Sequence, residues 1–253
     1  MRTHNKHIRV YTNGIDVSGY SRAVGALAWM FGAEPDAAVT DECKNILIGQ
    51  GEIQAGPLSA FLDNDAAGLW NLANAGTQTL NLMVAIGANA APAANDHVFA
   101  WTFEQAAYPV EQGAGFVAVS IPMVTSYASP LTYKRPWGRL LAPMAARTAV
   151  NSAVGIDDLG AASALGGIFV YHLQSSNGTV TLTAQEADTN SDVSFANITG
   201  ATSGAITAAV SPKHGMIALA TDAAIKRYLR WQLAFGTATT ATFAAAFIRN
   251  NIP

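Results

Sequence analysis

The stretch HIRVYTNGIDV, residues 7–17, decides the fold class of this chain. Apolar and polar residues alternate from Ile8 to Thr12, which is the period-2 pattern of a strand with one buried face. Asn13 and Gly14 follow, and this pair supplies the two positive-φ positions of a type I′ turn, whose twist suits antiparallel strands. The sequence therefore predicts that the chain begins with an antiparallel β-hairpin.

The same kind of signal recurs along the whole chain, because short apolar runs are separated by clusters of Gly, Asn, Ser and Pro. This spacing predicts a mainly β protein with an antiparallel β-sandwich or barrel. The expected strands are Ala26–Phe31, Glu52–Ala55, Leu80–Ile86, Val98–Phe103, Phe116–Thr125, Gly167–Leu173, Thr179–Glu186, Ile206–Val210, Ile225–Phe235 and Thr242–Ile248.

One segment has a helical pattern instead. Asp36–Leu47 contains neither Gly nor Pro, and Val39, Cys43 and Ile46 fall at helical spacing. We therefore expect one short amphipathic helix here, ending before Gly49.

The last two runs have the clearest strand pattern. Apolar and polar residues alternate through Ile225–Phe235, Thr242–Ile248 repeats the alternation, and the five residues 236–240 connect them. The pattern predicts a closing hairpin. Arg227 falls on its apolar side, so it should be paired with a carboxylate or with carbonyl groups.

A chain of 253 residues has room for two β lobes. We predict an N-terminal lobe with the helix (residues 1–128), a connecting or intersubunit arm (129–165) and a C-terminal lobe (166–253). Three prolines in the arm argue against long regular strands or helices. Its large apolar side chains would form a sticky patch on a monomer, so we expect them to contact a neighbouring subunit. These interface candidates are Tyr133, Trp137, Leu140, Leu141 and Met144.

Composition points to an assembly. Charged residues make up 12% of the chain and hydrophobic residues 50%, against about 25% charged in an average soluble protein. Runs of about 18 apolar residues, which a membrane-spanning helix needs, are absent from the sequence. We infer a surface largely covered by partner subunits, a homo-oligomer without a membrane partner. The polar start of the chain, with no apolar signal core, suggests assembly in the cytoplasm.

The sequence offers no catalytic or metal-binding constellation. The five histidines lack metal-site spacing, and no G-x-S-x-G elbow is present. Asp188–Asp192 looks like half of a calcium loop, but Val193 stands where Gly is needed and Thr199 where Glu is needed. Lys and Arg are scattered and the net charge is −3, which argues against tight nucleic-acid binding. We expect no enzyme activity, no cofactor and no metal.

Several segments resemble structural proteins of bacteriophage tails. Val10–Tyr20 is similar to the motif V-x-V-N-G-x-D-L-S-G-Y at the start of that family, and Leu27-Ala28-Trp29 and Gly56–Asn64 follow as there. Near the other end, Asp188–Ile198 resembles the S-D-D-x-x-F-A-D-L loop of the family. Its closing V-K-R-Y-L-R…F-x-V-A-F pattern is similar to residues 225–230 and 242–247. These matches cover about half of the chain, at its two ends.

The resemblance implies a tail-tube subunit, a virion protein with a β-sandwich fold that joins its sheets to those of neighbours. Such subunits stack as rings around a channel through which DNA passes without sequence-specific binding. The rings would be hexameric, or trimeric with two lobes per subunit, and would contact other virion proteins. Two alternatives stay open: a capsid decoration or head-fibre protein, and a carbohydrate-binding β-sandwich of a tail fibre.

Overall fold

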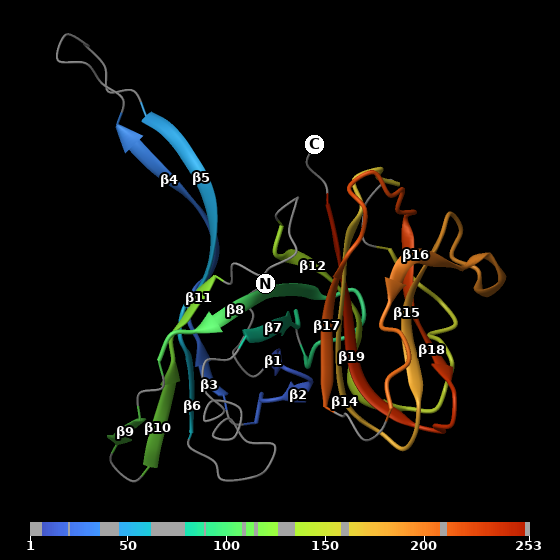
Figure 1. Ribbon diagram of the computed structural model, residues 1–253, viewed down its shortest axis with the longest axis horizontal. Coiled ribbons are helices and arrows are strands. Elements are labelled where there is room, and N and C mark those ends of the chain that lie inside the picture. Colours follow the sequence, from blue (N-terminus) through green and yellow to red (C-terminus); the bar gives the residue numbers. More distant parts are fainter. Residues whose placement is uncertain are drawn as a thin grey trace.

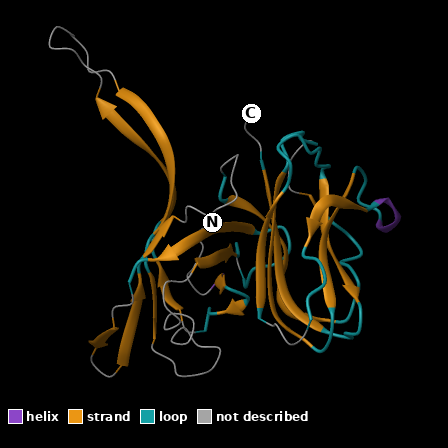
Figure 2. Ribbon diagram, in the orientation of Figure 1, coloured by secondary structure: helices purple, strands orange, loops and turns teal. Residues whose placement is uncertain are grey.

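The computed structural model describes residues 7–19, 21–35, 46–61, 79–88, 90–107, 110–113, 116–125, 135–157, 162–207 and 212–250. Strands dominate these ranges, every strand pairing is antiparallel, and the helix described there is the single 3₁₀ turn η2 (Asp192–Ser194). Figure 2 shows this composition. The prediction of a mainly β, antiparallel fold is confirmed, with open sheets and no closed barrel among the described strands.

A nine-stranded sheet is the centre of the molecule (Figure 1). Its ladder runs in the order β17 (Lys213–Ala218), β14 (Gly167–Ser176), β19 (Ala241–Arg249), β12 (Trp137–Arg147), β8 (His97–Gln105), β7 (Thr79–Ile86), β1 (Ile8–Thr12) and β2 (Ile15–Asp16). The ninth strand, β11 (Met123–Thr125), pairs with β8 beyond the end of β12.

Two four-stranded sheets cover the outer faces of this sheet. One consists of β3 (Ser21–Val24), β6 (Leu58–Phe61), β10 (Phe116–Ile121) and β9 (Val110–Gly113). The other consists of β13 (Ile156–Asp157), β18 (Tyr228–Phe235), β15 (Val180–Ala187) and β16 (Ala196–Thr202). Each encloses its own apolar core, one built from residues 10–123 and the other from residues 141–247.

A third core joins the two halves. It contains Tyr11 and Met83 from the first half and Val170 and Ala246 from the second. The central sheet therefore curls, so that the face opposite each outer layer packs against the other half. Strands β2 and β14 also come into contact, although they are not paired. The division into residues 1–128, 129–165 and 166–253 stays a prediction, since the central sheet takes strands from all three ranges.

The opening hairpin is confirmed. β1 pairs with β2 in the register Thr12↔Ile15. The turn residues have positive φ, 48° at Asn13 and 90° at Gly14. The Asn-Gly signal was therefore sufficient to fix this turn.

The expected helix over Asp36–Leu47 is wrong at its end and otherwise lies outside the described residues. Ile46 and Leu47 begin β5 (Ile46–Ala55), which runs through Gly49 and Gly51 and pairs with β4 (Leu27–Pro35). The two form a separate two-stranded sheet that projects from the body (Figure 1). Pairing with β4 outweighs the helical spacing of three apolar residues.

The closing hairpin is also corrected. β18 pairs with β15 and β13, whereas β19 pairs with β12 and β14, so residues 236–240 carry the chain from one sheet to the facing one. Trp231 and Phe243 meet across this sandwich, with ring centroids 5.2 Å apart and a T-shaped geometry. Two strongly apolar strand faces cover each other better in facing sheets than side by side in a hairpin.

The prediction that Ser129–Leu165 lacks long strands is wrong for β12, which has eleven residues. Pro143 lies within it, where the register with β19 shifts between Leu140 and Ala142 and again between Ala142 and Ala145. A bulge leaves backbone groups outside the ladder, so proline is tolerated there. Three prolines were therefore weaker evidence against a strand than we had assumed.

Candidate functional site

The predicted interface residues do not form one exposed patch. Leu140 and Leu141 are buried, Leu140 in the core between the halves and Leu141 in the C-terminal core. Met144 is half-buried against the core between the halves, and Tyr133 lies outside the described residues. The expected patch is therefore wrong for the two leucines, because β12 is an internal strand whose side chains face cores on both sides.

Trp137 is the candidate that remains accessible. It begins β12 and is 39% exposed, and its ring meets the buried ring of Phe99 edge-on, with centroids 5.2 Å apart. Trp101 is buried, and Trp70 lies outside the described residues. Among the tryptophans whose side chains the structure describes, Trp101, Trp137 and Trp231, only Trp137 is exposed, so these three do not build the exposed aromatic platform that sugar binding favours.

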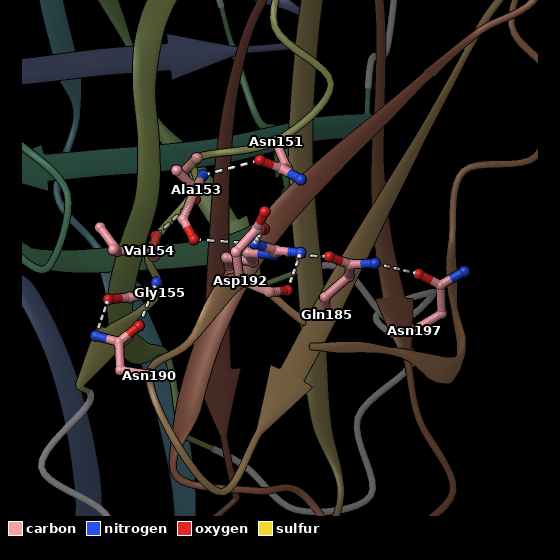
Figure 3. A network of polar contacts seen from close by, with 10 residues as sticks. Asn151, Ala153, Val154, Gly155, Gln185, Asn190, Asp192 and Asn197 are labelled. Atoms are coloured by element: carbon pink, nitrogen blue, oxygen red, sulfur yellow. Dashed lines mark hydrogen bonds and ion pairs between the residues drawn. The ribbon is translucent and has the colours of Figure 1, made fainter. Parts of the chain in front are cut away.

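A polar cluster surrounds Arg230 on β18, and Figure 3 shows its partners Ala153, Gln185 and Asp192. This side chain is only 4% exposed. Its Nε donates to Oε1 of Gln185 at 2.7 Å, and Nη1 donates to the carbonyl of Ala153 at 3.1 Å and to the carboxylate of Asp192. The guanidinium also lies 4.2 Å from the ring centroid of Phe195. One buried cation thus ties β15 and β18 to two separate loops.

Further contacts bind these loops to each other. The amide of Asn190 accepts from the backbone N–H of Gly155 at 2.7 Å and donates to its carbonyl at 3.0 Å. The side chain of Asn151 accepts from the N–H of Ala153, which has a left-handed φ of 53°. Residues 151–155 and 190–195 are therefore held as one unit, including a backbone conformation that alanine rarely adopts.

The sequence pointed to Arg227 as the buried cation, and this is corrected. Arg227 is exposed and forms a bidentate ion pair with Asp157, with N–O distances of 2.6 and 3.1 Å. Pairing with a carboxylate is confirmed, but burial is not. Alternation runs regularly only within β18, which begins at Tyr228. Arg227 precedes that strand, so the pattern assigned it to the wrong side.

Three exposed valines lie on or next to the two loops of the polar cluster: Val154 and Val193 within them, and Val150 directly before the first. Val150, Val154 and Val193 are 55, 62 and 93% exposed. The other exposed large apolar side chains of the described residues are Val124 on β11 and Trp137 on β12, which are both strands of the central sheet.

A hollow of about 330 Å³ lies beside Val124, where the projecting hairpin joins the body. We call it the hairpin-base hollow, and its apolar lining comes from Ala26, Ala28, Ile53, Ala55, Met123 and Val124. Its remaining lining residues, Gln54, Gly56 and Thr125, carry no charge.

Two histidines lie where the curled central sheet nearly closes. His172 on β14 and His214 on β17 are register partners, and their ring centroids are 6.4 Å apart. Nδ1 of His172 accepts from the backbone N–H of Gly14 at 3.1 Å. Burial, with His214 as a second cause, lowers the pKa of His172 to about 3. Burial also lowers the pKa of His214, against a hydrogen bond to the Asn13 backbone that raises it.

Within the described residues, no three His, Cys, Asp or Glu side chains gather closely enough to hold a metal ion. That part of the chain also contains no helix long and apolar enough to cross a membrane. The half calcium loop Asp188–Asp192 forms the tip between β15 and β16, and Asp192 is an ion-pair partner of Arg230.

Comparisons with known proteins show little. No protein-family model matches the chain, and no curated protein matches it. One similar solved structure is the Dit (gp 19.1) protein of phage SPP1, described as a paradigm of the hub adsorption apparatus in phages that infect Gram-positive bacteria. The alignment covers 95% of this chain and 98% of that one, with 11% identity and a TM-score of 0.34. A likeness at this level establishes neither the fold nor the function of the chain.

Proposed function

We propose that this chain is a structural subunit of a bacteriophage tail, of the tail-tube type, which assembles into rings stacked around a channel for DNA. The proposal starts from the sequence resemblance of the two ends of the chain. It is consistent with a mainly β chain that carries little charge, because we expect neighbouring subunits to cover much of such a surface.

The observation that carries the proposal is the projecting β4–β5 hairpin (Figure 1). Its strands, with nine and ten residues, pair only with each other among the described strands. A single two-stranded hairpin is marginally stable in water, and its long edges are templates for pairing with another chain. Charges on these strands are limited to Glu34 and Glu52. A neighbouring subunit that covers the hairpin removes both problems, as the resemblance to tail-tube proteins implies.

Shortening the hairpin tests this role. Phe31 and Gly51 are register partners, so residues 32–50 can be replaced by Asn-Gly, which closes a two-residue turn between them. We expect the shortened protein to fold, as circular dichroism would show, and to form no rings or tubes in negative-stain electron microscopy under conditions where the unmodified chain does. Normal rings from the shortened protein would show that the hairpin is not needed for assembly.

Location in the virion tests the function itself. Antibody labelling or electron microscopy of the phage should place the protein along the tail, with six-fold or pseudo-six-fold symmetry. Isolated copies on the capsid surface would replace the tube by the decoration alternative.

A further inference from the structure

Two histidines connect the first turn of the chain to the opposite end of the central sheet. The ladder of this sheet begins with β17 and ends with β2, yet the turn that leads into β2 lies against β14 and β17. A Cβ on Gly14 would lie 2.8 Å from the backbone N and O of Lys213, the first residue of β17. We call this junction the seam: the Asn13-Gly14 turn on one side, and His172, Lys213 and His214 on the other.

The hydrogen bonds of the seam define which ring nitrogen of each histidine carries the proton. Nδ1 of His172 accepts from the backbone N–H of Gly14, so the proton of neutral His172 is on Nε2. His214 forms a hydrogen bond with the Asn13 backbone that raises the pKa of His214, so its ring is the donor. Nδ1 of His214 is buried without a hydrogen-bond partner, which leaves Nε2 as that donor. One ring therefore holds the turn as an acceptor and the other as a donor.

An added proton has opposite effects on these two contacts. The nitrogen of His172 that is free to take a proton is Nδ1, and once protonated it can no longer accept from Gly14. The nitrogen of His214 that takes a proton is Nδ1, which makes no contact, so the bond from Nε2 to the Asn13 backbone survives. His172 is therefore the contact of the seam that acid breaks.

The surroundings of His172 do not favour a positive charge. The elements packed around this side chain carry these titratable and charged groups: Arg9, Tyr11 and Asp16 on the first hairpin, Lys213 and His214 on β17, and Arg249 at the far end of β19.

The ring of Tyr11 lies 6.3 Å from that of His172, and burial raises the pKa of Tyr11 to about 12, so this neighbour is neutral. The Asp16 carboxylate accepts hydrogen bonds from the N–H and O–H of Ser18. Burial lowers the pKa of His172 to about 3, and His214 lowers it further. The closed seam therefore holds His172 in its neutral form.

We propose that His172 is an acid-released latch, whose protonation frees the first turn from β14 and opens the seam while the other strands of the central sheet stay paired. The closed seam keeps its full stability above about pH 6.5, where an exposed histidine is neutral, and loses stability as the pH falls below that value. Opening uncovers the start of β17, the terminal strand of the sheet. An open edge of this kind is a template for pairing with another chain.

Amide hydrogen exchange of Gly14, followed by NMR spectroscopy, reports the opening directly, because this N–H is the group that His172 holds. For one histidine that regains a pKa of about 6.5 on opening, the opening equilibrium constant should rise about 25-fold from pH 7 to pH 5, after correction for the intrinsic rate. Low urea should leave Gly14 exchange at pH 5 unchanged, since a local opening exposes little surface. The Val180 amide, bonded to the carbonyl of Ile206 far from the seam, should exchange by global unfolding and accelerate with urea.

Two variants identify the titrating group. His172→Asn keeps an acceptor for Gly14 but does not titrate, so the 25-fold rise should disappear. His97→Asn removes an exposed histidine on β8 and should leave the rise intact. A 25-fold rise that persists in His172→Asn overturns the proposal, as does a Gly14 amide with the same urea dependence as Val180, which would make the opening global.

A measurement on the unmodified chain keeps the test independent of how the variants fold. The ¹⁵N shifts of the His172 ring at pH 7 should show a protonated Nε2 and an unprotonated Nδ1. The reverse tautomer would mean that His172 does not accept from Gly14, and the latch would then be wrong.

Discussion

The backbone N–H of Gly14 donates a hydrogen bond to Nδ1 of His172, 3.1 Å away and 158 residues later in the chain. This bond joins the turn of the first hairpin to β14, at the point where the curled central sheet comes closest to closing. A turn defined by two local residues thus becomes a long-range contact between the two halves of the molecule.

Gly14→Ala should destabilise the fold. A Cβ at this position would lie 2.8 Å from backbone atoms of Lys213, and the φ of +90° is itself unfavourable for alanine. Left-handed strain alone costs about 1–2 kcal/mol, and the crowding adds about 1–3 kcal/mol to the loss in free energy of unfolding. Urea unfolding followed by circular dichroism measures the total.

Two other glycines separate these contributions. Gly204 has a φ of 66°, and a Cβ added there would have no neighbouring atom within 4 Å. Gly204→Ala should therefore show the backbone strain alone. Gly19→Ala has open space and no positive φ, and should be nearly neutral. Equal losses at Gly14 and Gly204 would show that the contact with Lys213 is not tight.

His172 should make the protein sensitive to acid. Burial lowers its pKa to about 3, whereas an unfolded histidine has a pKa near 6.5. Below pH 6.5 the unfolded chain therefore binds more protons than the folded one. Stability is full above pH 6.5 and falls as the pH drops toward 3, by up to about 1.4 kcal/mol per pH unit for this one group.

Urea midpoints at pH 7 and pH 5 for the unmodified chain and for His172→Asn give the measurement. Asparagine offers an acceptor oxygen to the N–H of Gly14 but does not titrate. The urea midpoint of the His172→Asn variant should therefore fall less between pH 7 and pH 5 than that of the unmodified chain. His97, whose pKa is also lowered, titrates in both proteins and acts as the internal reference. Identical drops would mean that His172 is not the acid-sensitive group.

The sequence located the first hairpin but not this contact, and the difference is physical. Asn13-Gly14 specifies a turn through backbone preference alone, which is a local property. The partner of that turn is the buried side chain of His172, and the histidine spacing in the sequence was informative only about metal binding. Long-range partners of this kind depend on how the sheet curls, which neither period nor composition records.

Arg230 should matter far more for stability than Arg227. Arg230→Ala leaves the buried Gln185 side chain and the carbonyl of Ala153 without their donor, and breaking a buried charged network costs about 3–5 kcal/mol. Arg227→Ala removes an exposed pair with Asp157, for which about 1 kcal/mol or less is expected. Thermal melts of the two variants rank them directly. Comparable melting temperatures would contradict the burial of Arg230.

The strand pattern identified this part of the chain correctly and its pairing incorrectly. Alternation predicted β18 and β19 within a few residues, yet it could not show that they belong to facing sheets, since both arrangements bury the same residues. The alternation also puts Arg230 on the polar face of β18, which gave no sign that this side chain is buried. In the structure, the loop of residues 151–155 covers that face, and the carbonyl of Ala153 accepts a hydrogen bond from Arg230. The sequence of this loop has neither a strand nor a helix period, so it gave no sign of the contact.

Trp137→Ala should affect folding because the Trp137 ring rests edge-on against buried Phe99. It should also affect assembly if a neighbour covers the exposed part of this side chain. An edge-to-face pair contributes about 0.5–1.5 kcal/mol beyond buried area, so we expect a modest loss of monomer stability in urea unfolding. If a neighbour also covers the exposed 39% of this side chain, sedimentation should show association weakened by about 2 kcal/mol beyond that loss.

Leu140→Ala, three residues along the same strand, is the matched comparison. Leu140 is fully buried, so its loss should cost about 2–5 kcal/mol in the monomer, and any effect on assembly should follow from unfolding alone. Trp137→Phe keeps a ring against Phe99 and should restore most of the monomer stability. If Trp137→Ala destabilises the monomer as much as Leu140→Ala and leaves association of the folded fraction unchanged, Trp137 is a core residue and takes no part in the interface.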